Sequence, residues 1–246
     1  MQQLISNSAN VSINGLSDSF IDTQNKTLTN LKDLLVQSGY KSELDTLSKY
    51  LPAVLNKGVQ SATSGVIQDP AGSAIGSGQF PKGGGASGAI YNHFSDLKPI
   101  PRINPIEAVF NESELDGGRV LHCYSPYLNG SPNTLSDCTV ALQALTNAYL
   151  NAFTAIRLLP PTPGTPQIFR EFGAVPLAGR IFAHNFKNND LDHLHPGNTV
   201  ASILIAQSEM IRAGKTVPKL TIYYFDKPVY KAAESVLAEL SEELNN

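Results

Sequence analysis

The hydrophobic residues of the first 60 positions recur at the spacing of an amphipathic helix. One apolar stripe runs over residues 28–35 and ends before Gly39, which is a suitable stop. A second stripe covers residues 44–55, where Pro52 disturbs the helix or marks a restart. The pattern predicts that residues 1–60 form a strand and helical segment, mainly helical, that packs on the rest of a single domain.

From residue 61 to residue 246, strand-like and helix-like segments alternate. Strands are expected near 66–67, at 120–124, within 172–182 and at 219–225, and helices at 86–94, 135–156, 199–213 and 229–240. Residues 98–118 carry no clear period. Alternation of this kind predicts an α/β core with a largely parallel sheet that helices cover on both faces.

Composition and charge narrow the class of protein. A chain that is 41% hydrophobic and 16% charged, with a net charge of −3, is expected to be soluble and globular. Basic residues form no run, so no nucleic-acid surface is expected. The start has no signal-peptide pattern, and no stretch approaches the roughly 20 apolar residues of a membrane span. We expect a cytoplasmic protein without membrane contact, with delivery into a host cell as an open alternative.

Metal and disulfide chemistry have weak candidates in this chain. Cys123 and Cys138 lack CxxC spacing, and His122 would point to the opposite face of a strand from Cys123. Small buried residues are expected there, with a disulfide or a metal pair as the alternative. The loop 190–195 contains two aspartates and two histidines, yet no third ligand follows at a fixed offset. A solvated loop is expected, and therefore no metal and no cofactor.

The strongest chemical signal is a glycine triplet at residues 83–85, after a strand and at the start of a helix. Glycines let the backbone approach a phosphate closely, and a helix N-terminus adds partial positive charge. The segment lacks the Lys-Ser or Lys-Thr of a Walker loop and the spacing of a dinucleotide fingerprint. It predicts an anion-binding loop, with an unliganded surface loop as the alternative.

The segment 83–90, GGGASGAI, resembles the phosphate-loop signature of the macrodomain family. Three later segments resemble that family in the same order: VLHCYSPYL (120–128), AVPLAGRIFA (174–183) and IYYFDKPVYKAAESVL (222–237). The resemblance covers roughly residues 60 to 240. It implies a three-layer α/β/α fold with a mixed, mostly parallel sheet and an N-terminal helical extension, and a cleft that binds ADP-ribose.

The resemblance also implies a role for each matching position. The segment 83–90 would wrap the diphosphate and the proximal ribose, and the segment 179–182 would form the opposite wall. Phe225 would pack on adenine, or else be the last core residue of its strand. The implied ligand-binding residues are Gly72, Gly83, Gly84, Gly85, Ala86, Ser87, Gly88, Ala89, Ile90, Gly179, Arg180, Ile181, Phe182, Phe225 and Asp226.

The chain departs from the family where macrodomain hydrolases carry Asn-Ala-Ala-Asn. The equivalent residues here are 69–72, Asp-Pro-Ala-Gly, so both asparagines are absent. Asp69 is the candidate catalytic residue, as a general base or a ligand of ribose hydroxyls, and the alternative is an Asp-Pro turn without function. For the acidic residue that normally contacts the adenine amino group, the candidates are Asp18 and Asp22.

Three functions follow from these residues. The first is hydrolysis of ADP-ribosyl modifications, with a water activated by Asp69 or by substrate phosphate. The second is a non-catalytic reader of ADP-ribosylated partners. The third is a protein-interaction scaffold with a decayed cleft. Loss of the asparagines weakens the first, and the intact glycine signature weakens the third. The expected partner is ADP-ribose or an ADP-ribosylated protein.

Overall fold

The computed structural model describes residues 2–6, 11, 13, 20–22, 27–62, 65–71, 85–100, 103–114, 118–126, 135–159, 171–178 and 194–245. The strands are β1 (Gln2–Ser6), β2 (Ile21–Asp22), β3 (Thr27–Leu28), β4 (Ala53–Leu55), β5 (Val66–Ala71), β6 (Glu107–Glu112), β7 (Arg119–Tyr124), β8 (Glu171–Ala174) and β9 (Lys219–Tyr223). The α-helices are α1 (Leu31–Gln37), α2 (Leu44–Leu47), α3 (Gly85–His93), α4 (Leu135–Leu158), α6 (Leu194–Arg212) and α7 (Lys227–Asn245). Short 3-10 turns are η2 (Lys41–Glu43), η3 (Ser48–Tyr50) and η4 (Val59–Ser61).

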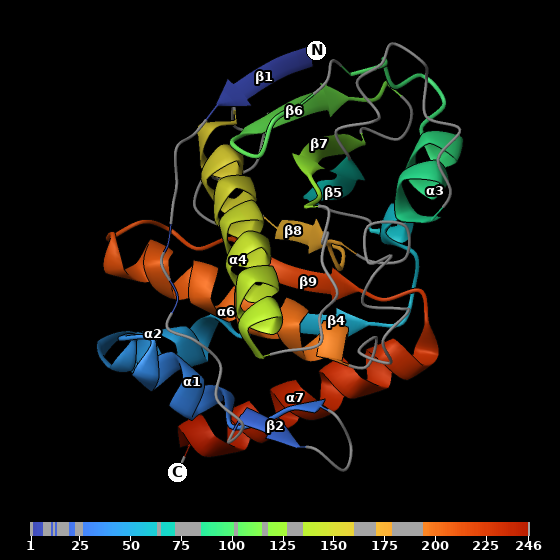
Figure 1. The fold of residues 1–246 in the computed structure, drawn as a ribbon. Helices are drawn as coiled ribbons and strands as arrows, with labels where there is room; N and C mark the ends of the chain where they lie inside the picture. The colour runs from blue at the N-terminus through green and yellow to red at the C-terminus, as the bar shows by residue number, and fades with distance from the viewer. Residues whose placement is uncertain are drawn as a thin grey trace.

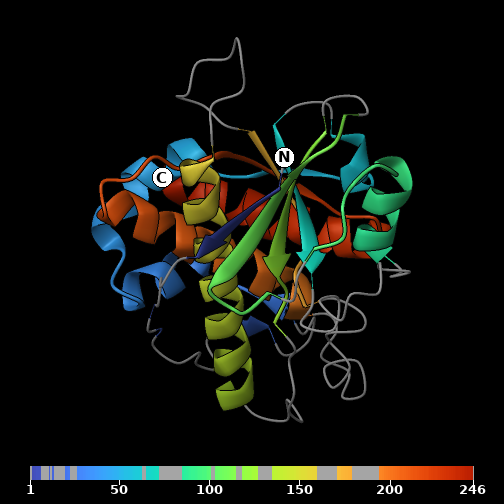
Figure 2. The ribbon, with the colours of Figure 1, turned by 90° about the horizontal axis from the view of Figure 1, so that it is seen from above.

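Seven strands form one mixed sheet in the order β1-β6-β7-β5-β8-β9-β4. Strands β7, β5, β8, β9 and β4 are parallel, whereas β6 is antiparallel to β7 and β1 is antiparallel to β6. Helices α4 and α6 pack together on one face, and α3 covers the other (Figures 1 and 2). The three-layer α/β/α architecture with a mostly parallel sheet is therefore confirmed.

The elements predicted by alternation beyond residue 61 are present, with ends that differ by a few residues. One further strand, β6, was not predicted, because it lies in the stretch 98–118 that carries no clear period. Its central residues 108–111 are all buried, because the strand lies inside the sheet with both faces covered. A strand buried on both faces has no polar and apolar alternation to reveal it.

The mainly helical prediction for the first 60 residues was wrong at four described segments, which form the strands β1, β2, β3 and β4. Of these, β1 and β4 form the two edges of the main sheet. The helical turns end at Tyr50, because Leu51 is extended (φ −54°, ψ 133°), as the residue before Pro52 must be. The stop at Gly39 is confirmed, with φ +89° just beyond α1.

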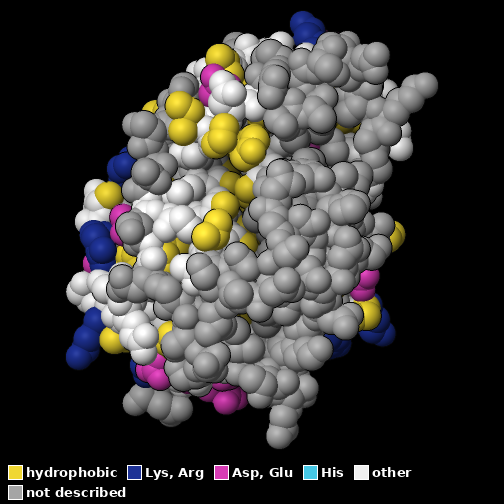
Figure 3. Space-filling view, in the orientation of Figure 1, with side chains coloured by type: hydrophobic (Ala, Val, Ile, Leu, Met, Phe, Trp, Pro, Cys, Tyr) yellow, Lys and Arg dark blue, Asp and Glu magenta, His cyan; other side chains and the backbone are white. Residues whose placement is uncertain are grey.

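Most of the hydrophobic core lies between the sheet and the layer of α4 and α6. Phe153 of α4 packs edge-on against Phe172 of β8, with ring centroids 6.1 Å apart. Hydrophobic side chains form a band along α4 on the face shown in Figure 3, and Val140 and Leu158 of this helix are exposed. Among the described helices, none combines the length and the apolar character needed to cross a membrane.

Candidate functional site

The carboxyl ends of five parallel strands meet at one edge of the sheet. Ligands of open α/β sheets bind beyond this edge, where loops lead from strands into helices. The strands end there at Leu55, Ala71, Tyr124, Ala174 and Tyr223. We call this the carboxyl edge.

The first turn of α3 lies at the carboxyl edge. The ring of Phe94, just past the helix, lies beside Gly118 at the start of β7, where an added Cβ would be 2.2 Å from the ring. Tyr91 stacks on His122 in the middle of β7, so α3 runs antiparallel to that strand. Ser87 is one turn further, about 6 Å along the helix. It is therefore level with the end of β7, which lies about 7 Å beyond His122.

This first turn has the features of an anion site. Gly85 begins α3 with φ +68°, and no atom of the described residues lies within 4 Å of the Cβ that a larger residue would carry. The backbone N–H groups of a first turn have no intrahelical acceptor and carry partial positive charge. The Ser87 side chain is 5% exposed and lies on the buried face of α3, and its hydroxyl has no hydrogen-bond partner among the described residues, so the backbone N–H groups are the donors that face outward. The turn therefore offers several donors at the carboxyl edge.

Two hydrogen bonds of Ser125 connect the ends of β5, β7 and β8. Its N–H donates to the Ala71 carbonyl (2.7 Å), and its Oγ accepts from the N–H of Ala178 (2.9 Å). Ala178 has φ +56°, a left-handed conformation that a non-glycine residue rarely adopts. The chain therefore turns sharply just before the predicted second wall of the cleft, 179–182, which lies outside the described residues.

Phe225 is the most exposed large hydrophobic residue at the carboxyl edge, at 81% exposure. Its neighbour Tyr224 is 1% exposed and fills the core position instead, so the alternative that Phe225 ends the core of its strand is wrong. The Asn56 amide nitrogen donates to the Tyr224 carbonyl (2.9 Å) and thereby connects the ends of β4 and β9. Asp226 is also exposed, and its carbonyl accepts the N–H of Tyr230 in α7.

Asp69 lies inside β5 and not at a strand end. Because β5 continues to Ala71, the alternative of an Asp-Pro turn is wrong. The side chain is 0% exposed, and its Oδ2 lies 2.6 Å from Nδ1 of His122 on β7. His122 is itself 0% exposed, as expected for a core histidine. The structure does not test the catalytic role predicted for Asp69, but the carboxylate has no surface open to a ligand.

Among the described residues, no acidic residue follows the end of β4, and Asp226 is the acidic residue that follows β9. Residues 53–62, which contain β4 and the chain that follows it, include neither Asp nor Glu. Asp22 lies in β2, which pairs with β3 in a separate two-stranded sheet. Asp18 lies outside the described residues. The adenine contact predicted for Asp18 or Asp22 stays a prediction.

The remaining predicted positions divide into two groups. Gly72, Gly83, Gly84 and the loop 190–193 lie outside the described residues. Ala86, Gly88 and Ala89 lie half-buried on α3, and Ile90 faces the core with 0% exposure. Their contacts with a ligand stay predictions.

Metal and thiol chemistry find no support in the described part of the chain. Among those residues, no three His, Cys, Asp or Glu side chains gather as metal ligands would. Cys123 is a free cysteine, and burial raises the pKa of its thiol well above the usual value. It therefore packs as a small core residue.

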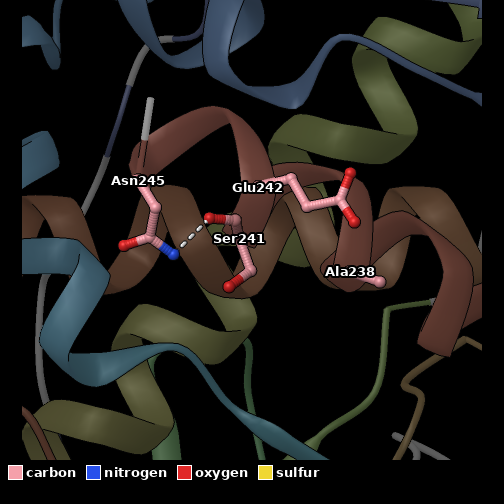
Figure 4. Close-up of a pocket in the computed structure, with 4 residues that line it drawn as sticks. All are labelled: Ala238, Ser241, Glu242 and Asn245. Carbon is pink, nitrogen blue, oxygen red and sulfur yellow. Dashed lines mark hydrogen bonds between the residues drawn. The ribbon is translucent and has the colours of Figure 1, made fainter.

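A shallow depression on α7 is lined by Ala238, Ser241, Glu242 and Asn245 (Figure 4). The described residues that line it come from one helix near the C-terminus, and Asn245 donates to the Ser241 carbonyl (2.7 Å) along that helix. Ligand sites normally combine polar groups that converge from several elements. We therefore place the candidate site at the carboxyl edge and not here.

Comparison with known proteins supports the architecture. No family model matches the chain, and no curated protein sequence matches it. A Trypanosoma brucei macrodomain in complex with ADP-ribose has a TM-score of 0.50 and 15% identity, over 75% of this chain and 68% of that one. An Oceanobacillus iheyensis macrodomain variant with ADPR has a TM-score of 0.53 and 16% identity, over 77% and 92%.

An alphavirus P23pro-zbd structure is also similar, with a TM-score of 0.51 and 17% identity over 78% of this chain. The present chain spans 24% of that viral chain, so the match concerns one portion of it. At these identities the similarity establishes the fold. The chain has the macrodomain fold, and it is divergent in sequence.

Proposed function

We propose that this protein with a macrodomain fold binds ADP-ribose at the carboxyl edge of its sheet. The observation that carries the proposal is the first turn of α3, where the exposed Gly85 is left-handed and the backbone N–H groups have no intrahelical acceptor. Structural neighbours that contain ADP-ribose and ADPR support the choice of ligand.

Each part of the edge suits one part of ADP-ribose. The N–H groups of the first turn of α3 suit the diphosphate, because a helix N-terminus attracts anions. The exposed ring of Phe225 suits the adenine, since bases stack on aromatic side chains. The turn at Ala178 leads the chain into the wall 179–182, which we propose contacts the diphosphate and the distal ribose.

We further propose that the protein reads ADP-ribosylated partners without hydrolysing them. The catalytic candidate of the sequence, Asp69, is fully buried against His122. A general base must reach a water beside the scissile bond, and a carboxylate without exposed surface does not. Hydrolysis of the ADP-ribosyl bond is the competing outcome in the test below.

Calorimetric titration with ADP-ribose, with AMP as the comparison ligand, tests the binding proposal. We expect ADP-ribose to bind at least about tenfold more tightly than AMP, which lacks one phosphate and the distal ribose. Absence of heat with ADP-ribose would refute binding. Incubation with an ADP-ribosylated protein then separates the two roles: retained label supports a reader, and released ADP-ribose shows a hydrolase.

A further inference from the structure

Four buried polar side chains from four elements meet between α3 and the sheet. They are Asp69 of β5, Tyr91 of α3, Asn111 of β6 and His122 of β7, and each is at most 4% exposed. Asp69 and His122 are direct partners in the register of β5 and β7. The cluster therefore connects the centre of the sheet to the helix whose first turn forms the proposed phosphate site.

The contacts of Asn111 determine which nitrogen of His122 carries the proton. The Asn111 amide nitrogen donates to the Lys98 carbonyl (3.0 Å), an acceptor only, which fixes the orientation of the amide. The same nitrogen lies 3.1 Å from Nε2 of His122. Because an amide nitrogen is a donor only, Nε2 must accept. The proton of the imidazole is therefore on Nδ1, and it is donated to Asp69 Oδ2 at 2.6 Å.

Tyr91 connects this imidazole to α3. The two rings stack, with centroids 5.6 Å apart and an interplanar angle of 25°, and the Tyr91 hydroxyl lies 3.5 Å from Nδ1. Burial and the nearby Asp69 carboxylate raise the pKa of Tyr91 well above its usual value, so the hydroxyl stays protonated. Ser87 lies one helical turn from Tyr91 on the same buried face of α3.

We propose that Asp69 and Asn111 hold His122 in its Nδ1-protonated form as a positioning residue for α3. The orientation of the imidazole then sets where Tyr91 sits, and hence the height of the first turn of α3 at the carboxyl edge. In this arrangement Asp69 acts through His122 and Tyr91 and does not touch the ligand. The effect of this positioning on ADP-ribose affinity rests on the proposed function. The positioning of α3 by His122 does not.

The conservative variant Asp69→Asn separates hydrogen bonding from carboxylate chemistry. Asp69 Oδ1 has no hydrogen-bond partner among the described residues, so an amide nitrogen in its place breaks none of the described bonds, and the remaining oxygen still accepts from Nδ1. We expect ADP-ribose affinity within about threefold of wild type for Asp69→Asn and at least about tenfold weaker for Asp69→Ala. Thr154→Val, which removes a buried hydroxyl between α4 and α6, is the matched control with unchanged affinity.

Two measurements on the unliganded protein keep the test independent of ADP-ribose binding. Nitrogen-15 NMR of labelled histidine should show His122 protonated on Nδ1 and bare at Nε2 at neutral pH. Amide hydrogen exchange in α3 should be about tenfold faster in Asp69→Ala than in wild type, and near wild type in Asp69→Asn. If Asp69→Ala does not fold, the tautomer of His122 and the α3 exchange of Asp69→Asn still test the proposal.

The proposal is overturned by an Nε2-protonated or doubly protonated His122, or by slow α3 exchange in Asp69→Ala. It is also overturned if Asp69→Asn loses as much affinity as Asp69→Ala, because the charge would then be what matters. Failure of the wild type to bind ADP-ribose would refute the proposed function alone. The tautomer of His122 and the amide exchange in α3 would still test the positioning role.

Discussion

Replacing Gly85 by alanine tests whether the first turn of α3 is the phosphate site, and Gly214 supplies a matched control. The two glycines have φ values of +68° and +62°, and neither would bring a Cβ within 4 Å of an atom in the part of the chain that the structure describes. Gly85 opens α3 at the carboxyl edge, whereas Gly214 ends α6. The two substitutions therefore introduce the same backbone strain without a clash, at a proposed site and away from it.

The left-handed conformation costs a residue with a Cβ about 1–2 kcal/mol. Each variant should consequently lose about 1 kcal/mol of stability, which lowers the melting temperature by roughly 2–4 °C in a chain of this size. In Gly85→Ala the strain can be relieved by rotating the residue, which moves the first N–H groups of α3. A loss of about 1.4 kcal/mol in these contacts corresponds to tenfold weaker binding.

Thermal unfolding and calorimetric titration with ADP-ribose measure both quantities on the same samples. We expect the two variants to be destabilised alike, with Gly85→Ala binding about tenfold more weakly and Gly214→Ala within about twofold of wild type. Equal affinities in the two variants would refute the assignment of the diphosphate to this turn. A loss of affinity in both would show that binding follows overall stability and not the geometry of α3.

Three further predictions concern other parts of the molecule. Phe225→Ala should leave stability within about 0.5 kcal/mol of wild type but weaken ADP-ribose binding about tenfold in calorimetry, while Leu158→Ala, another exposed residue, should change neither. Ser125→Ala should cost about 1–3 kcal/mol in urea unfolding, since it leaves the buried N–H of Ala178 without an acceptor; an unchanged midpoint would contradict this role. The hydrogen bond from Arg212 lowers the pKa of Glu43, so the pair stabilises the fold at neutral pH, and this contribution is lost as the pH falls below about 4.5. Glu43→Gln should be less stable than wild type at pH 7 by about 0.5–1 kcal/mol, and this gap should narrow as the pH falls through the lowered pKa of Glu43; a gap independent of pH would rule out the charge.

Several features of the candidate site were accessible from sequence because they depend on short segments. The glycine triplet before a helix, and an aromatic residue just beyond a strand, are local patterns with a direct physical reading. What the strand pattern left open was which of two adjacent aromatics is buried. Tyr224 fills the core and Phe225 is exposed, because the ladder between β4 and β9 sets the register of that strand end.

Other features depended on contacts between distant residues. Asp69 looked like the start of a turn, but its strand runs on beside β7 and pairs it with His122, 53 positions away. Asn111 gave no signal, since β6 is buried on both faces and its pattern shows no period. Sequence spacing likewise did not show that β4 lies next to β9, whereas Asp22 of the N-terminal segment lies in β2 of a separate sheet.

The sequence by itself determined the alternation of strands and helices beyond residue 61, the parallel character of most of the sheet and the position of the glycine-rich segment. These follow from hydrophobic periodicity and backbone chemistry, which act over a few residues. Only the tertiary structure decided that the first 60 residues supply both edge strands, and that Asp69 is held by His122 inside the protein. Strand order and the contacts between buried polar groups depend on how distant segments pack. Local periodicity does not determine which distant segments pack together.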